Sequence, residues 1–349
     1  MQPIIQGLLM ISASVVFCLG YYYLSNWFLD NIFLPAHGRN INRNISLANQ
    51  IRPWLFLFPA LFALLVYLAY PVLETLRLSL TERHAYGDEW VGLANYAQMF
   101  NDQKFWEAFR NNMSWLVIVP AISTGFGLLA AHLTDRIGWG NAAKSIIFMP
   151  MAISFVGASV IWKLVYDARP VDQDQIGLIN ALYLFFGGDA PQTWITMSLW
   201  NNLFLMIVLI WIQTGFAMVI LAAALRSIPE ETIEAAIIDG SNPWQLFFRI
   251  KVPQIKGTIL VVWTTITITV LKVFDIVYAM TNGHWNTQVL ANYMFDKFFR
   301  GNDWGVGSAS AIVLMLLVTP ILVWNVKNAR KEIQYRSKHG QYSWKKIIT

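Results

Sequence analysis

The sequence is poor in charge for its length. Only 13% of its 349 residues are Asp, Glu, Lys or Arg, whereas soluble domains carry about a quarter. Hydrophobic residues make up 56% of the chain, and the mean hydropathy is +0.46. Because so few charges cannot solvate the surface of a soluble domain this large, the composition predicts a polytopic membrane protein.

Three kinds of functional site are also missing from the sequence. Cys18 is the only cysteine, which excludes an intrachain disulfide and a thiol metal cluster. The five histidines are scattered without the spacing of metal ligands. The sequence has no Walker A loop, so the chain cannot hydrolyse ATP by that route. If ATP drives its function, ATP and Mg²⁺ bind to a separate ATPase, and we expect no cofactor or metal on this chain.

Seven apolar runs are long enough to cross a membrane, which takes about 20 helical residues. They cover residues 4–29, 53–76, 112–133, 144–166, 198–224, 258–280 and 305–326. The first run is too long for a signal peptide, has no Lys or Arg at its start and lacks a small-residue cleavage site. We therefore expect an all-α fold with an extra N-terminal transmembrane helix, 1–30, before a six-helix core within 53–326.

The distribution of Lys and Arg predicts the orientation of the spans. One set of alternating segments holds 16 of these residues: 30–52, 134–145, 225–257 and 327–349. The other set holds 7: 1–3, 77–111, 167–197 and 281–304. Because cytoplasmic segments carry the excess of positive charge, the N-terminus is expected outside and the C-terminus inside. Residues 31–52 are then a cytoplasmic linker, and 327–349 form a basic cytoplasmic tail.

One charged stretch, 227–253, interrupts the apolar pattern on the predicted cytoplasmic side. Ser227 and Glu230 have the S-x-x-E spacing of a capping box, which predicts a helix beginning there. Gly240 can end that helix in a left-handed turn. Asn242 can cap a second helix. The stretch therefore predicts two short helices that lie outside the hydrocarbon.

The surface of this helix pair allows two interpretations. Ala235 and Ala236 permit the close approach of a partner, and Phe247 and Phe248 supply an apolar face. The second helix is expected to end at Pro253, whose ring disfavours a continuing helix. Such a pair can lie on lipid as an interfacial hairpin, or it can press against a soluble protein.

The same stretch resembles the EAA loop of binding-protein-dependent ABC importer permeases of the carbohydrate type. The resemblance rests on Glu234-Ala235-Ala236, Asp239-Gly240 and Ile250-x-Val252-Pro253. Other pieces that look like this family are GLANY at 92–96, FMPMAISFVGASVIWKLVYD at 148–167, IGLIN at 176–180 and FDIVYAMTNG at 274–283. The segments WIQTGFAMVILAAAL and KVFDIVYAMTNG are most similar to permeases for α-glucosides and glucosylglycerol-like compatible solutes.

This resemblance implies a multi-pass permease subunit of a bacterial inner membrane, not an enzyme. It also implies a second homologous permease, two copies of an ATPase and a soluble or lipid-anchored solute-binding protein. The complex would import a small sugar-like solute by alternating access: an α-glucoside, a disaccharide or glucosylglycerol. Seven residues would couple the loop to the ATPase: Glu234, Ala235, Ala236, Asp239, Gly240, Arg249 and Pro253.

The resemblance implies solute contacts as well. Register with maltose-type permeases, taken through the EAA glutamate, puts Gln213, Met151 and Phe155 at sugar-contacting positions. Ser154, Asn202, Trp211 and Thr214 add polar and aromatic groups in the same two spans.

The span 258–280 departs from the maltose-type pattern. The positions that are polar there fall on Ile266, Val270 and Val273. Thr265 and Thr269, four residues apart on one helix face, remain as hydroxyls for a solute. The solute is then either smaller and contacted elsewhere, or held mainly by the partner subunit.

Lys272 and Asp275 are charges inside an expected span, where each costs about 2.5–3.5 kcal/mol on insertion scales. On one helix, residues three apart can pair. They either line the translocation path or form an intrahelical pair that reaches the outer interface, and the sequence leaves both possibilities open.

Two rival functions remain. An ion-coupled secondary sugar transporter needs a buried acid, for which Asp275 is the candidate, and would work without an ATPase. A membrane enzyme such as a lipid-linked glycosyltransferase needs paired acids. Asp172 and Asp174 form a D-x-D in an outer segment, but no basic pocket accompanies them.

Overall fold

The computed structural model describes residues 2–33, 41–84, 87–135, 137–321, 323, 324 and 327, and most of these are helical. Their contacts divide the chain into two compact units, Met1–Thr75 and Leu76–Thr349. The expected span 53–76, up to Thr75, therefore belongs to the same unit as the N-terminal helix. The all-α class is confirmed.

Unit 1 consists of long helices. α1 (Gln2–Phe28) continues as a π-helical turn, Leu29–Phe33. α2 (Ile41–Leu64) continues through a second π-helical turn, Leu65–Ala69, into α3 (Tyr70–Ser79), whose residues up to Thr75 belong to this unit. This second helical stretch is longer than expected, because it begins inside the predicted linker 31–52.

A proline explains one contact between α1 and α2. Pro59 has no N–H, so the carbonyl of Leu55, four residues earlier, lacks its helical donor. The hydroxyl of Tyr21 donates to that carbonyl over 2.9 Å. Tyr22 stacks on Phe56 with ring centroids 5.5 Å apart.

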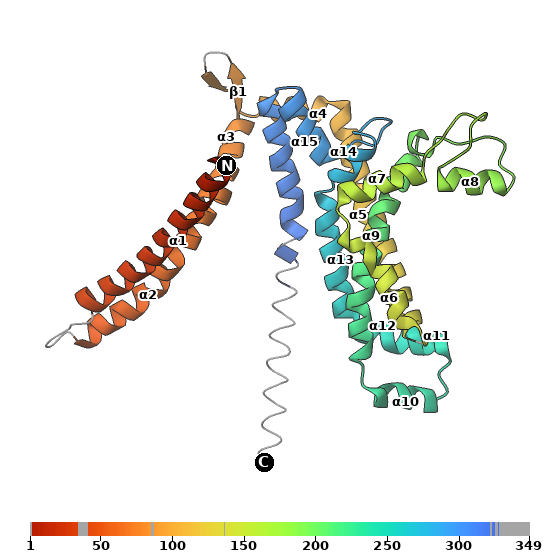
Figure 1. Ribbon diagram of the computed structural model, residues 1–349, viewed down its shortest axis with the longest axis horizontal. Helices are drawn as coiled ribbons and strands as arrows, with labels where there is room; N and C mark the ends of the chain where they lie inside the picture. Colours follow the sequence, from red (N-terminus) through yellow and green to blue (C-terminus); the bar gives the residue numbers. More distant parts are fainter. Residues whose placement is uncertain are drawn as a thin grey trace. The chain divides into compact units, whose positions relative to one another are not determined.

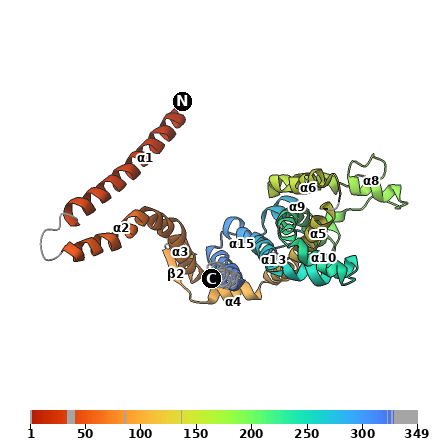
Figure 2. The same ribbon diagram turned by 90° about the horizontal axis from the view of Figure 1, so that it is seen from below.

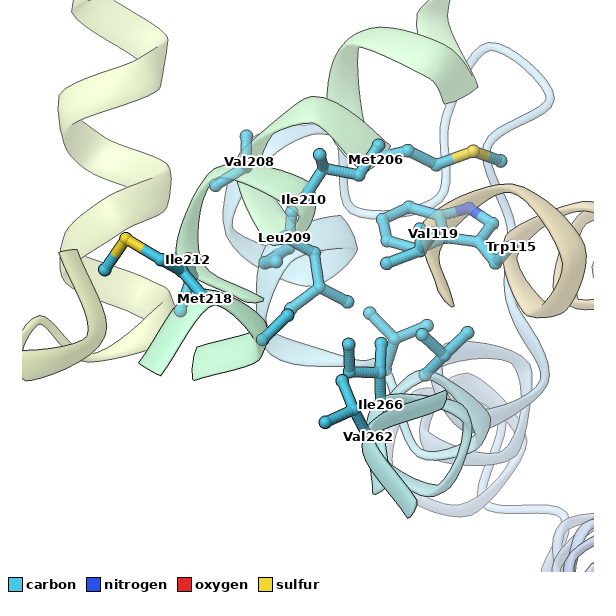
Figure 3. Packing of buried hydrophobic residues seen from close by; sticks show 14 of the residues in the cluster. Trp115, Val119, Met206, Val208, Leu209, Ile210, Ile212, Met218, Val262 and Ile266 are labelled. Carbon is cyan, nitrogen blue, oxygen red and sulfur yellow. The ribbon is translucent and has the colours of Figure 1, made fainter. Parts of the chain in front are cut away.

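Unit 2 is built around three packed helices, α5 (Gln103–Thr134), α9 (Asn201–Arg226) and α13 (Lys256–Leu271). Figure 2 shows them gathered together, with α6 and α8 to one side. Trp115 of α5, Leu209 of α9 and Ile266 of α13 point toward one another in the core (Figure 3), and all three are fully buried or nearly so. Gly127 allows α5 and α9 to approach closely, because a Cβ there would overlap Ala217.

The expected span 144–166 is not one straight helix. α6 (Gly140–Phe148) is followed by the 3-10 turn Met149–Ala152 and by α7 (Phe155–Val165). The two helices meet at 107°. Pro150 lies in the turn between them, and Ser154 restarts the helix as its N-cap. The prediction of one continuous helix is therefore wrong here.

The expected span 258–280 is also broken. α13 ends at Leu271, and α14 (Asp275–Met280) begins after a three-residue gap. At its other end, α13 meets the helical stretch Pro243–Gln254 at 71°. Of the described residues, five helices are long and apolar enough to cross a membrane, or up to seven if each bent pair counts as one span.

Shorter elements complete unit 2. A hairpin of β1 (Thr81–His84) and β2 (Gly87–Trp90) precedes α4 (Ala94–Asn101), and α8 (Leu178–Phe185) follows α7. α15 (Leu290–Phe295), a π-helical turn (Asp296–Arg300) and the helix Trp304–Ile321 close the described part. A second buried cluster, with Met99, Phe105, Tyr293 and Val306, joins α4, α5, α15 and this last helix.

Candidate functional site

The loop 227–253 begins where α9 ends. The hydroxyl of Ser227 donates to the carbonyl of Ala224 over 2.8 Å and so closes the last turn of α9. α10 (Glu230–Ile238) starts at Glu230 without a side-chain cap. The predicted Ser227–Glu230 capping box is therefore wrong. The reason is that α9 extends to Arg226 and has Ser227 as its C-cap.

The end of α10 is as predicted. Gly240 has a φ of +83°, in the left-handed region. Its N–H donates to the carbonyl of Ile237, and the N–H of Ser241 donates to that of Ala236, both over 3.0 Å. These two bonds form a Schellman motif, which satisfies carbonyls that a helix end leaves unpaired.

The second helix begins as predicted and ends later. The side chain of Asn242 accepts from the N–H of Gln245 over 2.8 Å, and the side chain of Gln245 accepts from the N–H of Asn242 over 3.0 Å. The helix runs as α11 (Pro243–Gln245), a π-helical turn (Leu246–Lys251) and α12 (Val252–Gln254). It passes through Pro253, which occupies the first turn of α12, and breaks at Ile255.

The predicted apolar face of this helix splits into a buried and an exposed part. Phe247 is buried and packs on the ring of His132 of α5, with centroids 4.4 Å apart. Ala236 is also buried, so of the two alanines only Ala235 is accessible. Phe247 therefore anchors the second helix of the loop to the core.

Four other apolar residues of the loop are uncovered in this chain, whereas Ile228 and Leu246 are buried. Ile238 is 84% exposed, and Ile237 is 56% exposed. Trp244 and Phe248 stack with centroids 5.7 Å apart and are 73% and 55% exposed. The remaining predicted coupling residues are all exposed: Glu234, Ala235, Asp239, Gly240, Arg249 and Pro253. An apolar patch rimmed by charge is typical of a protein-binding surface.

An ion cluster that the sequence did not predict lies beside the loop. Asp135, just after α5, accepts hydrogen bonds from Arg226 at the end of α9 and from Lys144 of α6. Partial burial raises the pKa of this carboxyl, but the hydrogen bonds and charges of Arg226 and Lys144 outweigh it and hold the pKa below its usual range. The cluster therefore fastens three helix ends together.

The predicted solute residues of α9 do not share a face. Trp211 and Thr214 line an apolar groove of about 1090 Å³ together with Phe126 and Ile146. Thr214 uses its hydroxyl on the carbonyl of Ile210. Gln213 lies about 100° around the helix from Thr214 and faces elsewhere.

Gln213 is only 9% exposed, and among the described residues its amide has no hydrogen-bond partner. The amide atoms of Gln213 are not among the fully buried polar atoms that lack a partner, so they remain accessible. Gln213 is thus a predicted path residue whose amide is open to a ligand from outside this chain.

The other predicted contacts in 144–166 lie at the bend between α6 and α7. Ser154 accepts from the N–H of Gly157 over 3.1 Å and is therefore committed to capping α7. Met151 is 42% exposed, whereas Phe155 is half-buried against the core.

The helix breaks also correct the prediction for the third span. Lys272 is the residue after α13 and is exposed, while Asp275 opens α14 and is half-buried. Among the described residues no ion pair joins them. The intrahelical pair is therefore wrong, because Phe274, with φ −140° and ψ −56°, interrupts the helix.

The hydroxyls and apolar residues of α13 have separate roles. Thr265 donates to the carbonyl of Val261, and Thr269 donates to that of Thr265. Ile266 and Val270 are fully buried. The departure from the maltose-type pattern thus reflects positions that serve the core of unit 2.

Comparison with known proteins identifies the family. The model for the binding-protein-dependent transport system inner membrane component matches residues 113–331. The chain belongs to this family. It is therefore a multi-pass permease component of a binding-protein-dependent ABC transport system and not an enzyme. Family membership sets aside the secondary transporter and the membrane glycosyltransferase.

Two curated relatives are similar to this permease over most of its length. The alpha-glucoside transport system permease protein AglF of Rhizobium meliloti is 60% identical over 95% of this chain and 99% of that protein. The osmoprotective compounds uptake permease protein GgtC of Synechocystis sp. is 47% identical over 81% of this chain and 100% of that protein.

A solved structure supports the fold. One chain of a bacterial ABC transporter involved in the import of the acidic polysaccharide alginate matches with a TM-score of 0.69 at 22% identity. The match covers 82% of this permease and 99% of that chain.

One predicted residue of the permease lies in a different place from the rest. Asn202 stands eleven residues before Gln213 along α9, about 16 Å away along the helix axis. Its amide donates to the carbonyl of Asn286 over 3.1 Å and to the side chain of Asn111 over 3.3 Å. No sequence signal indicated these partners, because Asn111 and Asn286 lie far from Asn202 along the chain.

Proposed function

We propose that this permease imports a small neutral α-glucoside as one half of a translocation path. The observation that carries the proposal is 60% identity, over 95% of the chain, to a permease named for alpha-glucoside transport. A second permease of the same fold would supply the other half. The partly accessible, unpartnered amide of Gln213 is suited to a sugar hydroxyl, which can both donate and accept.

The patch on the loop 227–253 is the proposed contact with a separate ATPase. Glu234 is exposed beside Ile237 and Ile238, and a carboxylate there can pair with a basic residue of the partner. Because Phe247 packs on His132 of α5, a push on the loop would reach the core helices directly. The positive-charge distribution supports a cytoplasmic location for this loop and the C-terminus, and an outside location for the N-terminus.

The proposal is tested by purifying the tagged chain from its host in mild detergent and assaying the complex. A second permease and a Walker A ATPase should co-purify. The reconstituted complex, supplied with ATP and the solute-binding protein, should accumulate radiolabelled maltose or trehalose in liposomes. The chain recovered without an ATPase, or a complete complex that moves no α-glucoside, would overturn it.

A related candidate solute is an osmoprotectant of the glucosylglycerol type, favoured by the 47% identity to the osmoprotective compounds permease. Competition decides between the two. Excess unlabelled glucosylglycerol should leave maltose uptake unchanged if an α-glucosidic disaccharide is the preferred solute, and should abolish it if the path prefers the osmoprotectant.

A further inference from the structure

A polar cavity lies at the end of α9 opposite the loop 227–253. In Figure 1, α10 lies at the lower end of unit 2, while α4, α14 and α15 lie at its upper end. The cavity has a volume of about 560 Å³ and is formed by α5, the start of α9 and the turn at Asn286. On α9 the cavity reaches Met206, which stands 20 residues, or about 30 Å along the helix axis, before Arg226 at the end of α9. The cavity is thus distinct from the proposed ATPase contact.

The lining is hydrophilic and close to neutral. On α5, Gln103, Glu107, Arg110 and Ser114 follow one another at three- and four-residue intervals, so they share one helix face. Glu107 and Arg110 are the only charged residues among those that line the cavity, and their charges cancel. The others are mainly carboxamides and hydroxyls. This set suits a neutral, hydroxyl-rich ligand better than an ion, because its polar side chains can exchange hydrogen bonds with hydroxyls.

The cavity wall is fixed by amides. Asn111 donates to the carbonyls of Asn286 and Gln288 over 2.9 and 2.8 Å. Asn201 donates to the carbonyl of Trp285 over 2.5 Å, and Asn202 donates to that of Asn286. These bonds hold the turn 281–289 against α5 and α9, so the polar wall is already in place without a ligand.

Backbone strain lies at the same place. Leu199 has a φ of +72°, Trp285 of +56° and Asn286 of +63°. Bulky residues such as leucine and tryptophan rarely adopt this region, and such strain concentrates at ligand-binding sites. Trp200 and Trp285 are the sequence neighbours of the cavity-lining residues Leu199 and Asn286. They are 61% and 52% exposed, so indole faces are accessible beside the cavity.

Several hydrogen-bonding groups remain available in this wall. Within the described residues, the Arg110 guanidinium has one bond, a 3.4 Å contact from Nε to the carbonyl of Trp106. The amide of Gln103 has none there. Glu107 uses one oxygen on the N–H of Gln288. Arg110 donors and the second Glu107 oxygen can therefore bind a polyol.

We propose that this cavity is a carbohydrate subsite at the mouth of the translocation path, in which Glu107 and Arg110 bind hydroxyls of a neutral sugar. The proposal rests on the proposed function for its solute class and its orientation. The subsite would hold the solute about 10–16 Å from Gln213 along α9, before it moves into the membrane interior.

Site-directed labelling tests the subsite, since Cys18 is the only native cysteine. In a Cys18→Ser background, Ser114→Cys puts a thiol in the cavity. Gln98→Cys, at an exposed position of α4 at the same end of unit 2, is the matched control. The assembled transporter without its solute-binding protein is treated with a water-soluble maleimide, with and without maltose. Protection of the Ser114→Cys thiol should follow occupancy, with labelling about fivefold slower when four-fifths of the sites are filled.

The controls separate this proposal from the proposed function. Gln98→Cys should label at the same rate with and without maltose, and adding Arg110→Gln should remove the protection of Ser114→Cys. Maltose uptake by the wild type with no protection would overturn the subsite alone. Absence of any α-glucoside uptake by the wild type would overturn the proposed function. Protection only when the binding protein is added, with or without maltose, would make the cavity a docking contact and overturn the subsite.

Discussion

At its first residues α9 is held by amides, because Asn201 and Asn202 bond to the turn 281–289. At its last residues it leads into a loop whose Ile238, Trp244 and Phe248 are uncovered. One end thus has fixed polar groups around a small cavity, and the other has an exposed apolar patch rimmed by acids. The difference agrees with the two proposed roles, a small polar ligand at the first end and a protein surface at the second.

The largest effect that sharpens this contrast is expected at Glu234. Glu234→Ala should lower ATP-driven uptake at least about tenfold, since the proposed ATPase contact would bury an ion pair of Glu234, and removing one partner of a buried ion pair costs several kcal/mol. The free energy of unfolding of the permease should change by less than about 0.5 kcal/mol, because the Glu234 side chain is exposed. Uptake and thermal unfolding of the complex measure the two effects. Glu230→Ala, on the same helix, is the control, and normal uptake by Glu234→Ala would contradict the assignment.

A substitution of Gln213 tests whether the middle of α9, like its polar first end, contacts the solute. Gln213→Leu keeps the volume and removes the amide, so sugar uptake should fall about tenfold, the loss of one or two hydrogen bonds. The complex should still assemble and hydrolyse ATP. Thr214→Val, whose hydroxyl is already used by the backbone, is the neighbouring control. Equal losses in both variants would mean that Gln213 acts through packing.

Asn111 tests the rigidity of the amide end. Asn111→Ala removes two bonds to the turn 281–289 and should destabilise that turn by about 1–3 kcal/mol. Amide hydrogen exchange at Trp285–Gln288 should become faster, while exchange in α10 stays unchanged. Asn101→Ala, an exposed asparagine just before α5, should change neither. Unaltered exchange in Asn111→Ala would show that other contacts hold the turn.

Gly240 tests the local structure of the loop end. Its φ is +83°, and no atom lies within 4 Å of the position that a Cβ would occupy. Gly240→Ala should therefore be disfavoured by backbone strain alone, about 1–2 kcal/mol. Gly240→Asn should be milder, because asparagine tolerates this conformation. Urea unfolding of both variants gives the comparison. An alanine variant as stable as the wild type would place the strain elsewhere.

The smallest effect concerns Asp135. Asp135→Asn should destabilise unit 2 by no more than about 1 kcal/mol at neutral pH, as for other partly exposed ion pairs. The pKa of Asp135 is lowered on folding, so its stabilisation is complete above the pKa of the unfolded chain. It is lost as the pH falls through the lower folded pKa. Melting curves of wild type and variant should therefore converge in acid, whereas Asp172→Asn should match the wild type at every pH.

Local signals in the sequence were sufficient for part of this structure. Asn242 and Gly240 were predicted as helix ends because a cap and a left-handed turn depend on neighbouring residues. Ser227 was assigned to the wrong helix because two helices compete for it, and only the length of α9 decides between them.

Long-range packing accounts for what the sequence did not predict. The break that separates Lys272 from Asp275 centres on Phe274, which packs on Tyr278 and Phe295. Asn111 donates a hydrogen bond to the carbonyl of Asn286, which lies 175 residues away along the chain. Neither contact leaves a periodic pattern, so the polar cavity could not be predicted, whereas the composition was sufficient to predict a membrane protein and the apolar runs to predict its long spans.

The Tyr21 hydroxyl has a consequence for how unit 1 enters a membrane. In hydrocarbon, water cannot replace a missing donor, and each unsatisfied backbone group costs several kcal/mol. Tyr21 supplies a donor in place of the one that Pro59 removes from the carbonyl of Leu55, so this carbonyl is easier to bury in lipid with Tyr21 beside it. α1 and α2 are thus expected to be inserted and retained as a hairpin, and Tyr21→Phe would loosen that hairpin without changing the hydrophobicity that the translocon reads.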